Sequence, residues 1–141
     1  MTSEVFTGLI DHAKSVVPIE ACGYLASRNG IVVYQYRLKN LEYSAVHFTL
    51  DPQDQFEALK DMQKKEAELA AVYHSHPVTA AWPSKEDIRL AYDPDISYVI
   101  VSLYNGVETI KAFRIRNHAV QPEEIQIVQA PPEDYSSEAM G

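Results

Sequence analysis

Two histidines and one aspartate are the residues of this sequence best suited to bind a catalytic metal. His74 and His76 are separated by one residue, a spacing that turns both imidazoles to the same face of an extended strand. Asp87 belongs to the segment Ser84-Lys85-Glu86-Asp87, whose pattern is typical of a helix start capped by Ser84. Three such ligands would leave the fourth position of a tetrahedral zinc ion open for water, as catalytic zinc requires. The sequence therefore predicts a zinc site, because imidazole and carboxylate ligands suit this metal.

Hydrolysis at such a site also needs a group that moves protons, and a carboxylate usually does this. Glu20 is the best candidate because it lies at the start of an apolar segment rather than on the wet face of a helix. A plain surface position is the alternative for Glu20, and Glu42, Glu66 and Glu86 are competing candidates. Ser84 is expected to cap its helix, and its hydroxyl could also donate a hydrogen bond to a developing oxyanion.

The remaining reactive or aromatic residues indicate chemistry less clearly. Cys22 could be a nucleophile or a ligand, but a buried lone thiol usually behaves as a small apolar group, and we favour that interpretation. Trp82 could shape a substrate groove or pack on the core, and the sequence favours neither. His12, His47 and His118 have no ligand partner at a suitable spacing and are interpreted as structural or exposed. The patterns H-E-x-x-H and P-C-x-x-C, typical of other zinc hydrolases and deaminases, are absent.

Length and composition indicate one soluble globular domain. The chain has 141 residues, enough to bury a single core. Its net charge of -8 argues against nucleic-acid binding, which normally needs a basic surface. The first residues lack the features of a signal peptide, and no segment has the roughly 20 apolar residues of a membrane helix. The single cysteine permits no internal disulfide, so we expect a cytoplasmic protein.

Apolar periodicity and turn residues predict alternating helices and strands, an α/β (α+β) fold, in one domain over residues 1–130. Helices are predicted over residues 3–17, from Asp51-Pro52 onwards, and from Ser84 to about Tyr92. Strands are predicted over 19–26, 31–36, 44–50, 69–76, 97–104, 107–116 and 125–129, with hairpin turns at Asn29-Gly30 and Asn105-Gly106. The acidic segment 131–141 is predicted to be disordered.

Taken together, the motif residues resemble those of a known family. Glu20, the segment His74-Ser75-His76-Pro77 and the segment Pro83-Ser84-Lys85-Glu86-Asp87 resemble the JAMM (MPN-plus) zinc metalloprotease motif without a gap or a substitution. The order of the expected elements is similar to the family's over nearly the whole chain. The resemblance implies a single mixed, curved sheet flanked by helices, similar to the cytidine deaminase fold. It also implies that His74, His76 and Asp87 bind one zinc ion with water as the fourth ligand, that Glu20 is the general acid and base, and that Ser84 stabilises the tetrahedral intermediate.

The chain resembles the small prokaryotic members of this family, because it lacks room for the insertions with which eukaryotic members grip ubiquitin. The segment Glu20-Ala21-Cys22-Gly23-Tyr24-Leu25 is typical of the bacterial group. The resemblance implies an (iso)peptidase that cleaves after the C-terminal Gly-Gly of a ubiquitin-like or sulfur-carrier protein, trimming it or releasing an amino acid such as cysteine. Two alternatives stay open, a catalytically silent MPN scaffold and a zinc amidase or peptidase acting on small peptides. The sequence also does not decide which carrier is the substrate, whether the protein forms a homodimer, or whether residues 37–46 contact the substrate.

Overall fold

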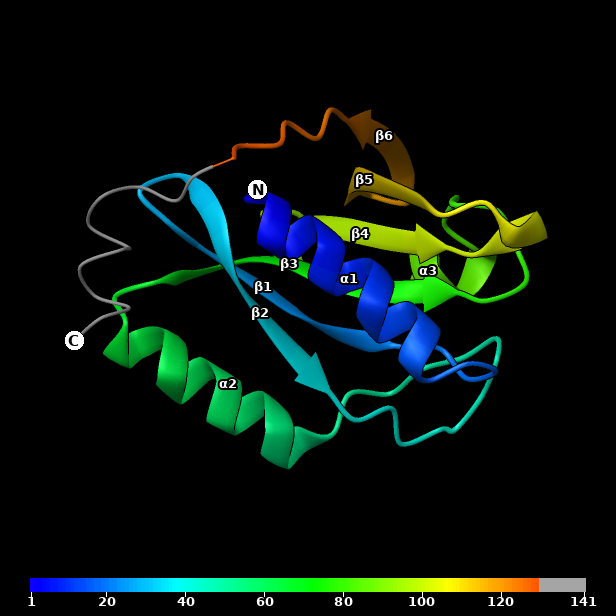
Figure 1. Ribbon diagram of the computed structural model, residues 1–141, viewed down its shortest axis with the longest axis horizontal. Coiled ribbons are helices and arrows are strands. Elements are labelled where there is room, and N and C mark those ends of the chain that lie inside the picture. The colour runs from blue at the N-terminus through cyan, green and yellow to red at the C-terminus, as the bar shows by residue number, and fades with distance from the viewer. Residues whose placement is uncertain (130–141) are drawn as a thin grey trace.

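The computed structural model describes residues 1–129, which are built around one six-stranded sheet (Figure 1). The segment 131–141, for which the sequence predicts disorder, lies outside the described residues. The helices are α1 (Ser3–Ser15), α2 (Pro52–Lys64), α3 (Lys85–Arg89) and the 3-10 turn η1 (Tyr104–Gly106). The strands are β1 (Cys22–Arg28), β2 (Ile31–Leu38), β3 (Glu68–His76), β4 (Ser97–Ser102), β5 (Thr109–Arg116) and β6 (Ala119–Glu123).

The sheet is mixed, with the strand order β2-β1-β3-β4-β5-β6. β3 and β4 pair in parallel, and every other neighbouring pair in the sheet is antiparallel. Parallel strands cannot be joined by a tight turn, so the chain between β3 and β4 must cross a face of the sheet. This crossover, residues 77–96, carries α3 and brings it next to the end of β3.

Helix α1 covers one face of the sheet, in front of the strands in Figure 1. Thr2 caps this helix by accepting a hydrogen bond from the Val5 amide. Its apolar residues recur every four positions and form one buried stripe. The stripe and the strand residues that it covers form the largest core cluster, which contains Val5, Leu9, Ala13, Leu25, Ala71, Tyr73, Val99, Val101 and Ala112.

The opposite face of the sheet is covered by α2 and by the crossover with α3. Asp51 caps α2 and Pro52 occupies its first turn, as the sequence predicts. The buried residues of α2, Ala58 and Met62, pack on the β1–β2 side of the sheet. Under the crossover, Ala81 packs with Ile100, Phe113 and Ile115. A gap between these two clusters remains on this face, and the candidate site occupies it.

Both predicted hairpin turns and most predicted elements are confirmed, but two predicted strands are wrong. Residues 44–50 form an irregular loop with a single isolated bridge between Asn40 and Leu50. The alternation of Val46, Phe48 and Leu50 suggested a strand there, yet Val46 is 58% exposed. The backbone groups of this loop bond instead to the Asn40 side chain and to Glu20, as described below. Segment 44–50 is therefore not part of the sheet.

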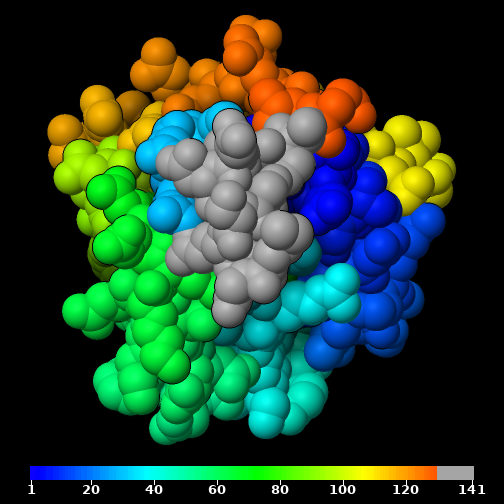
Figure 2. All heavy atoms as spheres, turned by 60° about the vertical axis from the view of Figure 1, so that its left-hand side comes forward, coloured from blue at the N-terminus to red at the C-terminus, as the bar shows by residue number. Residues whose placement is uncertain are grey.

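The last strand is β6, not the predicted 125–129. Asn117 and His118 both have positive φ and form a two-residue hairpin turn, after which β6 pairs with β5. A proline such as Pro122 argues against a strand in the sequence. It is tolerated here because β6 lies at the edge of the sheet. Residues 124–129 run beside the start of α1, where the Val128 amide donates to the Met1 carbonyl at 2.9 Å (Figure 2). The helices α1 and α3 are also shorter than predicted. None of the helices in residues 1–129 is long and apolar enough to cross a membrane.

Candidate active site

The end of β3 delivers both histidines to the sheet face opposite α1. β3 pairs with β1 so that His74 lies opposite Cys22, and two further bonds extend this pairing. The Ser75 amide donates to the Ala21 carbonyl at 2.9 Å, and the Ser75 hydroxyl accepts from the Ala21 amide at 2.7 Å. This register places Glu20 next to His76. Ser75, which is fully buried and lies between the two histidines in the sequence, thus holds the segment that leads from Glu20 into β1.

Asp87 reaches the histidines through the first turn of α3. The Ser84 hydroxyl accepts from the Asp87 amide at 3.0 Å, and Oδ2 of Asp87 accepts from the Ser84 amide at 2.9 Å, which together form a capping box. The same Oδ2 atom lies 3.0 Å from Nε2 of His74 and 3.2 Å from Nε2 of His76. The predicted cap by Ser84 is confirmed, and this cap also fixes the rotamer of Asp87.

The three side chains are arranged as metal ligands would be. The Nε2 atoms of His74 and His76 are 3.1 Å apart, so the three candidate donor atoms form a triangle with sides of 3.0–3.2 Å. Ligands about 2.0–2.1 Å from a tetrahedral zinc ion lie about 3.3 Å from one another. Nδ1 of His76 must donate to the Ala80 carbonyl, 2.9 Å away, because a carbonyl only accepts. That bond leaves the lone pair of Nε2 free for a metal.

The charges of the cluster fit a cation. Burial alone would raise the pKa of Asp87, but its hydrogen bonds with His74 and His76 outweigh burial and hold the pKa well below its ordinary value. Burial would lower the pKa of His76, yet the hydrogen bonds with Asp87 and the Ala80 carbonyl, together with the charges of Asp87 and Glu20, raise it overall. The negative charge of Asp87 beside two imidazoles fits a cation, and binding of a metal ion here competes with protons for the same atoms.

Glu20 has the properties of a proton carrier at this site. It is 4% exposed, and its Oε1 atom is buried without a hydrogen-bond partner among residues 1–129. Burial raises the pKa of this carboxyl to about 8, while His76 opposes the rise and Asp87 and Glu86 add to it. A buried, unpaired carboxyl with a pKa near neutrality can accept and return a proton. The competing candidates differ, since Glu42 and Glu66 are exposed and Glu86 is paired with His47.

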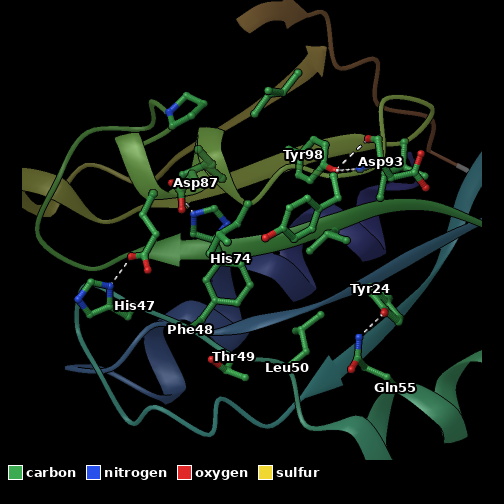
Figure 3. A pocket seen from close by; sticks show the side chains of 18 of the residues that line it. Tyr24, His47, Phe48, Thr49, Leu50, Gln55, His74, Asp87, Asp93 and Tyr98 are labelled. Carbon is green, nitrogen blue, oxygen red and sulfur yellow. Dashed lines mark hydrogen bonds and ion pairs between the residues drawn. The ribbon is translucent and has the colours of Figure 1, made fainter. Parts of the chain in front are cut away.

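A groove of about 500 Å³ begins at His74 and Asp87 and runs along the sheet towards Tyr24 (Figure 3). One wall consists of residues 47–50, which follow the loop segment that the sequence left open as a substrate contact. The Phe48 ring stacks on the His74 imidazole, with 4.6 Å between the ring centroids. At the same end, Nδ1 of His47 bonds to the Glu86 carboxylate and bridges the loop to α3.

The far end of the groove is formed by paired polar side chains and an apolar floor. Gln55 donates to the Tyr24 hydroxyl at 2.7 Å, and the Tyr98 hydroxyl donates to the Asp93 carbonyl at 2.9 Å (Figure 3). No lysine or arginine is among the described residues that line the groove. The lining includes Glu86, Asp87 and Asp93 beside its apolar floor, so the groove suits an extended segment of chain without acidic side chains.

The sequence predicted the side chains of the candidate site but not the residues that hold them in place. His74, His76, Asp87, Glu20 and Ser84 lie together as predicted. Buried Cys22 bonds to the Leu38 carbonyl, and burial raises its thiol pKa to about 12, which supports the inert interpretation. The Trp82 ring packs edge-on against Phe113, outside the groove lining. The missed residues are Asn40, His47, Phe48 and Ser75, whose roles depend on partners distant in sequence.

Comparison with known proteins agrees with this geometry. The model of the family described as prokaryotic homologs of the JAB domain matches residues 2–116. A CysO-cysteine peptidase from Mycobacterium tuberculosis is 31% identical over 130 residues, which cover 90% of this chain and 89% of the relative. A solution structure from Desulfitobacterium hafniense is 40% identical and covers 92% of both chains, with a TM-score of 0.83. A JAB1/MPN domain protein from Archaeoglobus fulgidus, 20% identical, shares the fold over 87% of this chain and 93% of its own, with a TM-score of 0.59. The chain therefore belongs to the family of prokaryotic homologs of the JAB domain and is a hydrolase of the JAMM type.

Proposed function

We propose that this protein is a zinc-dependent (iso)peptidase that hydrolyses the bond after the C-terminal Gly-Gly of a ubiquitin-like or sulfur-carrier protein. The leaving group would be a conjugated amino acid such as cysteine, or residues that extend the carrier. The observation that carries this proposal is the unpaired, buried carboxylate oxygen of Glu20 beside the cluster of His74, His76 and Asp87. The similarity to a CysO-cysteine peptidase over most of both chains supports a carrier conjugate as the substrate class.

In this proposal His74, His76 and Asp87 hold one zinc ion. When bound, zinc lowers the pKa of a coordinated water molecule and polarises the scissile carbonyl. Glu20 accepts a proton from the attacking water and then donates the same proton to the leaving amine as the C–N bond breaks. Glu20 is thereby returned to its starting state. The Ser84 hydroxyl accepts from the Asp87 amide, and its own hydrogen can be donated to the oxyanion.

The groove supports a glycine-rich tail as the part of the substrate next to the scissile bond. At its metal end the groove is bounded by Phe48 on His74 and by the bridge between His47 and Glu86. Two glycines can lie extended there because they bring no side chain. The apolar floor beyond them suits uncharged residues further upstream in the tail. We also propose a cytoplasmic location, which the lone, buried Cys22 supports.

Mass spectrometry tests the proposal with two matched substrates. The first is a folded carrier ending in Gly-Gly and extended by one cysteine, and the second is a free peptide with the same last residues. We expect zinc-loaded protein to release cysteine from the folded carrier, and Glu20→Gln to bind zinc normally while losing most of this activity. Cleavage of the peptide but never of the carrier would favour a small-peptide hydrolase. Absence of zinc and of any cleavage would favour a scaffold module.

A further inference from the structure

The Asn40 side chain organises the loop of residues 40–50, which lies between β2 and α2. It is 5% exposed, and all its hydrogen-bonding capacity is used. Its Oδ1 atom accepts from the Glu42 amide at 3.0 Å and from the Thr49 amide at 3.1 Å. Its Nδ2 atom donates to the His47 carbonyl and to the Glu20 carbonyl, each at 3.1 Å. One buried amide thus ties both ends of the loop to the backbone of Glu20.

The Glu20 peptide is held by this loop on both sides. Its carbonyl accepts from Asn40, and its amide donates to the Ser44 carbonyl at 2.7 Å. The Glu20 carboxylate, in contrast, has one buried oxygen that finds no hydrogen-bond partner within residues 1–129. Because its side chain is not fully fixed by its own hydrogen bonds, the place of the carboxylate depends on where the backbone is held. The loop, rather than a partner of the carboxylate, sets that place.

The same loop also contacts the metal side of the site and forms the groove wall. Phe48 stacks on His74, and His47 bonds to Glu86 on α3. Thr49, whose amide donates to Asn40, lines the groove. The loop therefore contacts the proton carrier, a candidate ligand and the substrate groove at once.

We propose that Asn40 is a positioning residue, which fixes the Glu20 backbone and the 40–50 loop so that the carboxylate and the groove wall keep the geometry needed for hydrolysis. This inference rests on the proposed function, in which Glu20 moves the proton. Asn40 does not touch the reacting atoms. A misplacement of about 1 Å in a reacting group can reduce a rate about 100-fold. We therefore expect a loss of kcat of this order when the two donated bonds of Asn40 are removed.

The test compares Asn40→Asp with Gln35→Glu. Asn40→Asp keeps both acceptor bonds but sets an oxygen against the carbonyls of Glu20 and His47. Gln35 is a matched control, because its amide nitrogen also donates two bonds, to the Gly8 carbonyl and the Tyr73 hydroxyl, on the α1 face of the sheet. Zinc content, thermal unfolding, kcat and KM are measured for both variants with the cysteine-extended carrier. Amide hydrogen exchange is measured by NMR on metal-free protein.

We expect Asn40→Asp to keep its zinc, to lose about 100-fold in kcat with a smaller rise in KM, and to speed hydrogen exchange at the Glu20 amide, which bonds to the loop at Ser44. Gln35→Glu should be destabilised without these effects. The inference would be overturned if kcat of Asn40→Asp fell only as much as its fraction of folded, zinc-loaded protein. It would also be overturned if the loss of kcat were no larger than that of Gln35→Glu. Unchanged hydrogen exchange at the Glu20 amide would also overturn it. If the wild type cleaves no substrate, the proposed function fails, while the exchange rates still decide whether Asn40 fixes Glu20.

Discussion

A buried histidine on the α1 face makes the stability of this protein depend on pH. His12 is 6% exposed, and its Nδ1 atom lies 2.7 Å from the Tyr73 hydroxyl. Burial, together with the charge of Arg37, lowers its pKa from 6.5 to about 4. The folded protein thus keeps this imidazole neutral at a pH where the unfolded chain protonates it.

The sign and the size of the effect follow from this difference. As pH falls below 6.5, the unfolded state takes up a proton on His12 and the folded state does not until the pH approaches 4. Stability is therefore complete at higher pH and is lost as pH falls through this window. Each pH unit in the window costs about 1.4 kcal/mol. Between pH 7 and pH 5, His12 should lower the free energy of unfolding by about 2 kcal/mol.

Urea unfolding of metal-free wild type and His12→Gln between pH 5 and pH 8 measures this contribution. Glutamine can still bond to the Tyr73 hydroxyl but does not titrate. The site histidines and all carboxylates are present in both proteins, so their contributions cancel in the difference. We expect parallel curves above pH 7 and an additional loss of about 2 kcal/mol for the wild type at pH 5. Equal pH dependence of the two proteins would refute the reasoning.

Three further outcomes are expected. His76→Ala should lower the zinc-to-chain ratio, measured by elemental analysis, from about 1 to near zero, and retention of the metal would exclude His76 as a ligand. Gly23→Ala should lower the free energy of unfolding, measured in urea, by about 1–3 kcal/mol. The reason is that a Cβ atom there would lie 2.2 Å from the Tyr36 carbonyl oxygen and 2.5 Å from the Tyr73 ring. Unchanged stability would contradict this close approach. Phe48→Ala should raise KM for the carrier about 2- to 10-fold with zinc retained, since it removes part of the apolar groove wall, and partial loss of such a buried contact costs about 0.5–1.5 kcal/mol of binding. Phe56→Ala, which removes a ring exposed on α2, is its control, and an equal effect of both would argue against a role of the groove wall.

Local patterns predicted most of the fold because local physics decides most of these elements. A four-residue apolar period predicts α1, a cap with a following proline predicts the start of α2, and Asn29-Gly30 predicts a tight turn. The prediction failed where a distant partner decides the backbone. Segment 44–50 alternates like a strand, but the Asn40 side chain and the Glu20 peptide take the bonds that a neighbouring strand would need. Edge strand β6 is mostly exposed and so has no apolar pattern to detect.

The candidate site shows the same division. Two histidines on one strand and a carboxylate in a capping box are local patterns, so the proximity of His74, His76, Ser84 and Asp87 could be predicted from spacing alone. Spacing along the chain gave no comparable reason to choose Glu20. Glu20 lies beside His76 only because of the register in which β1 pairs with β3. The fixation of Glu20 by Asn40 joins residues from two segments that are not adjacent in the chain. Such a contact follows only from the three-dimensional arrangement.

The crossover between β3 and β4 sets different limits on insertions along its length. Its first part is fixed at successive points, since the Thr79 carbonyl accepts from the Ser102 hydroxyl and the Ala80 carbonyl accepts from His76. A residue inserted between His76 and Ser84 would pull α3, and Asp87 with it, away from the histidines. After α3, by contrast, Tyr92 is 80% exposed at the groove wall. The chain is held again from Asp93, whose amide and carbonyl both bond to the Tyr98 hydroxyl. An insertion at Tyr92 would therefore extend the groove wall into solvent and leave the spacing from His76 to Asp87 unchanged.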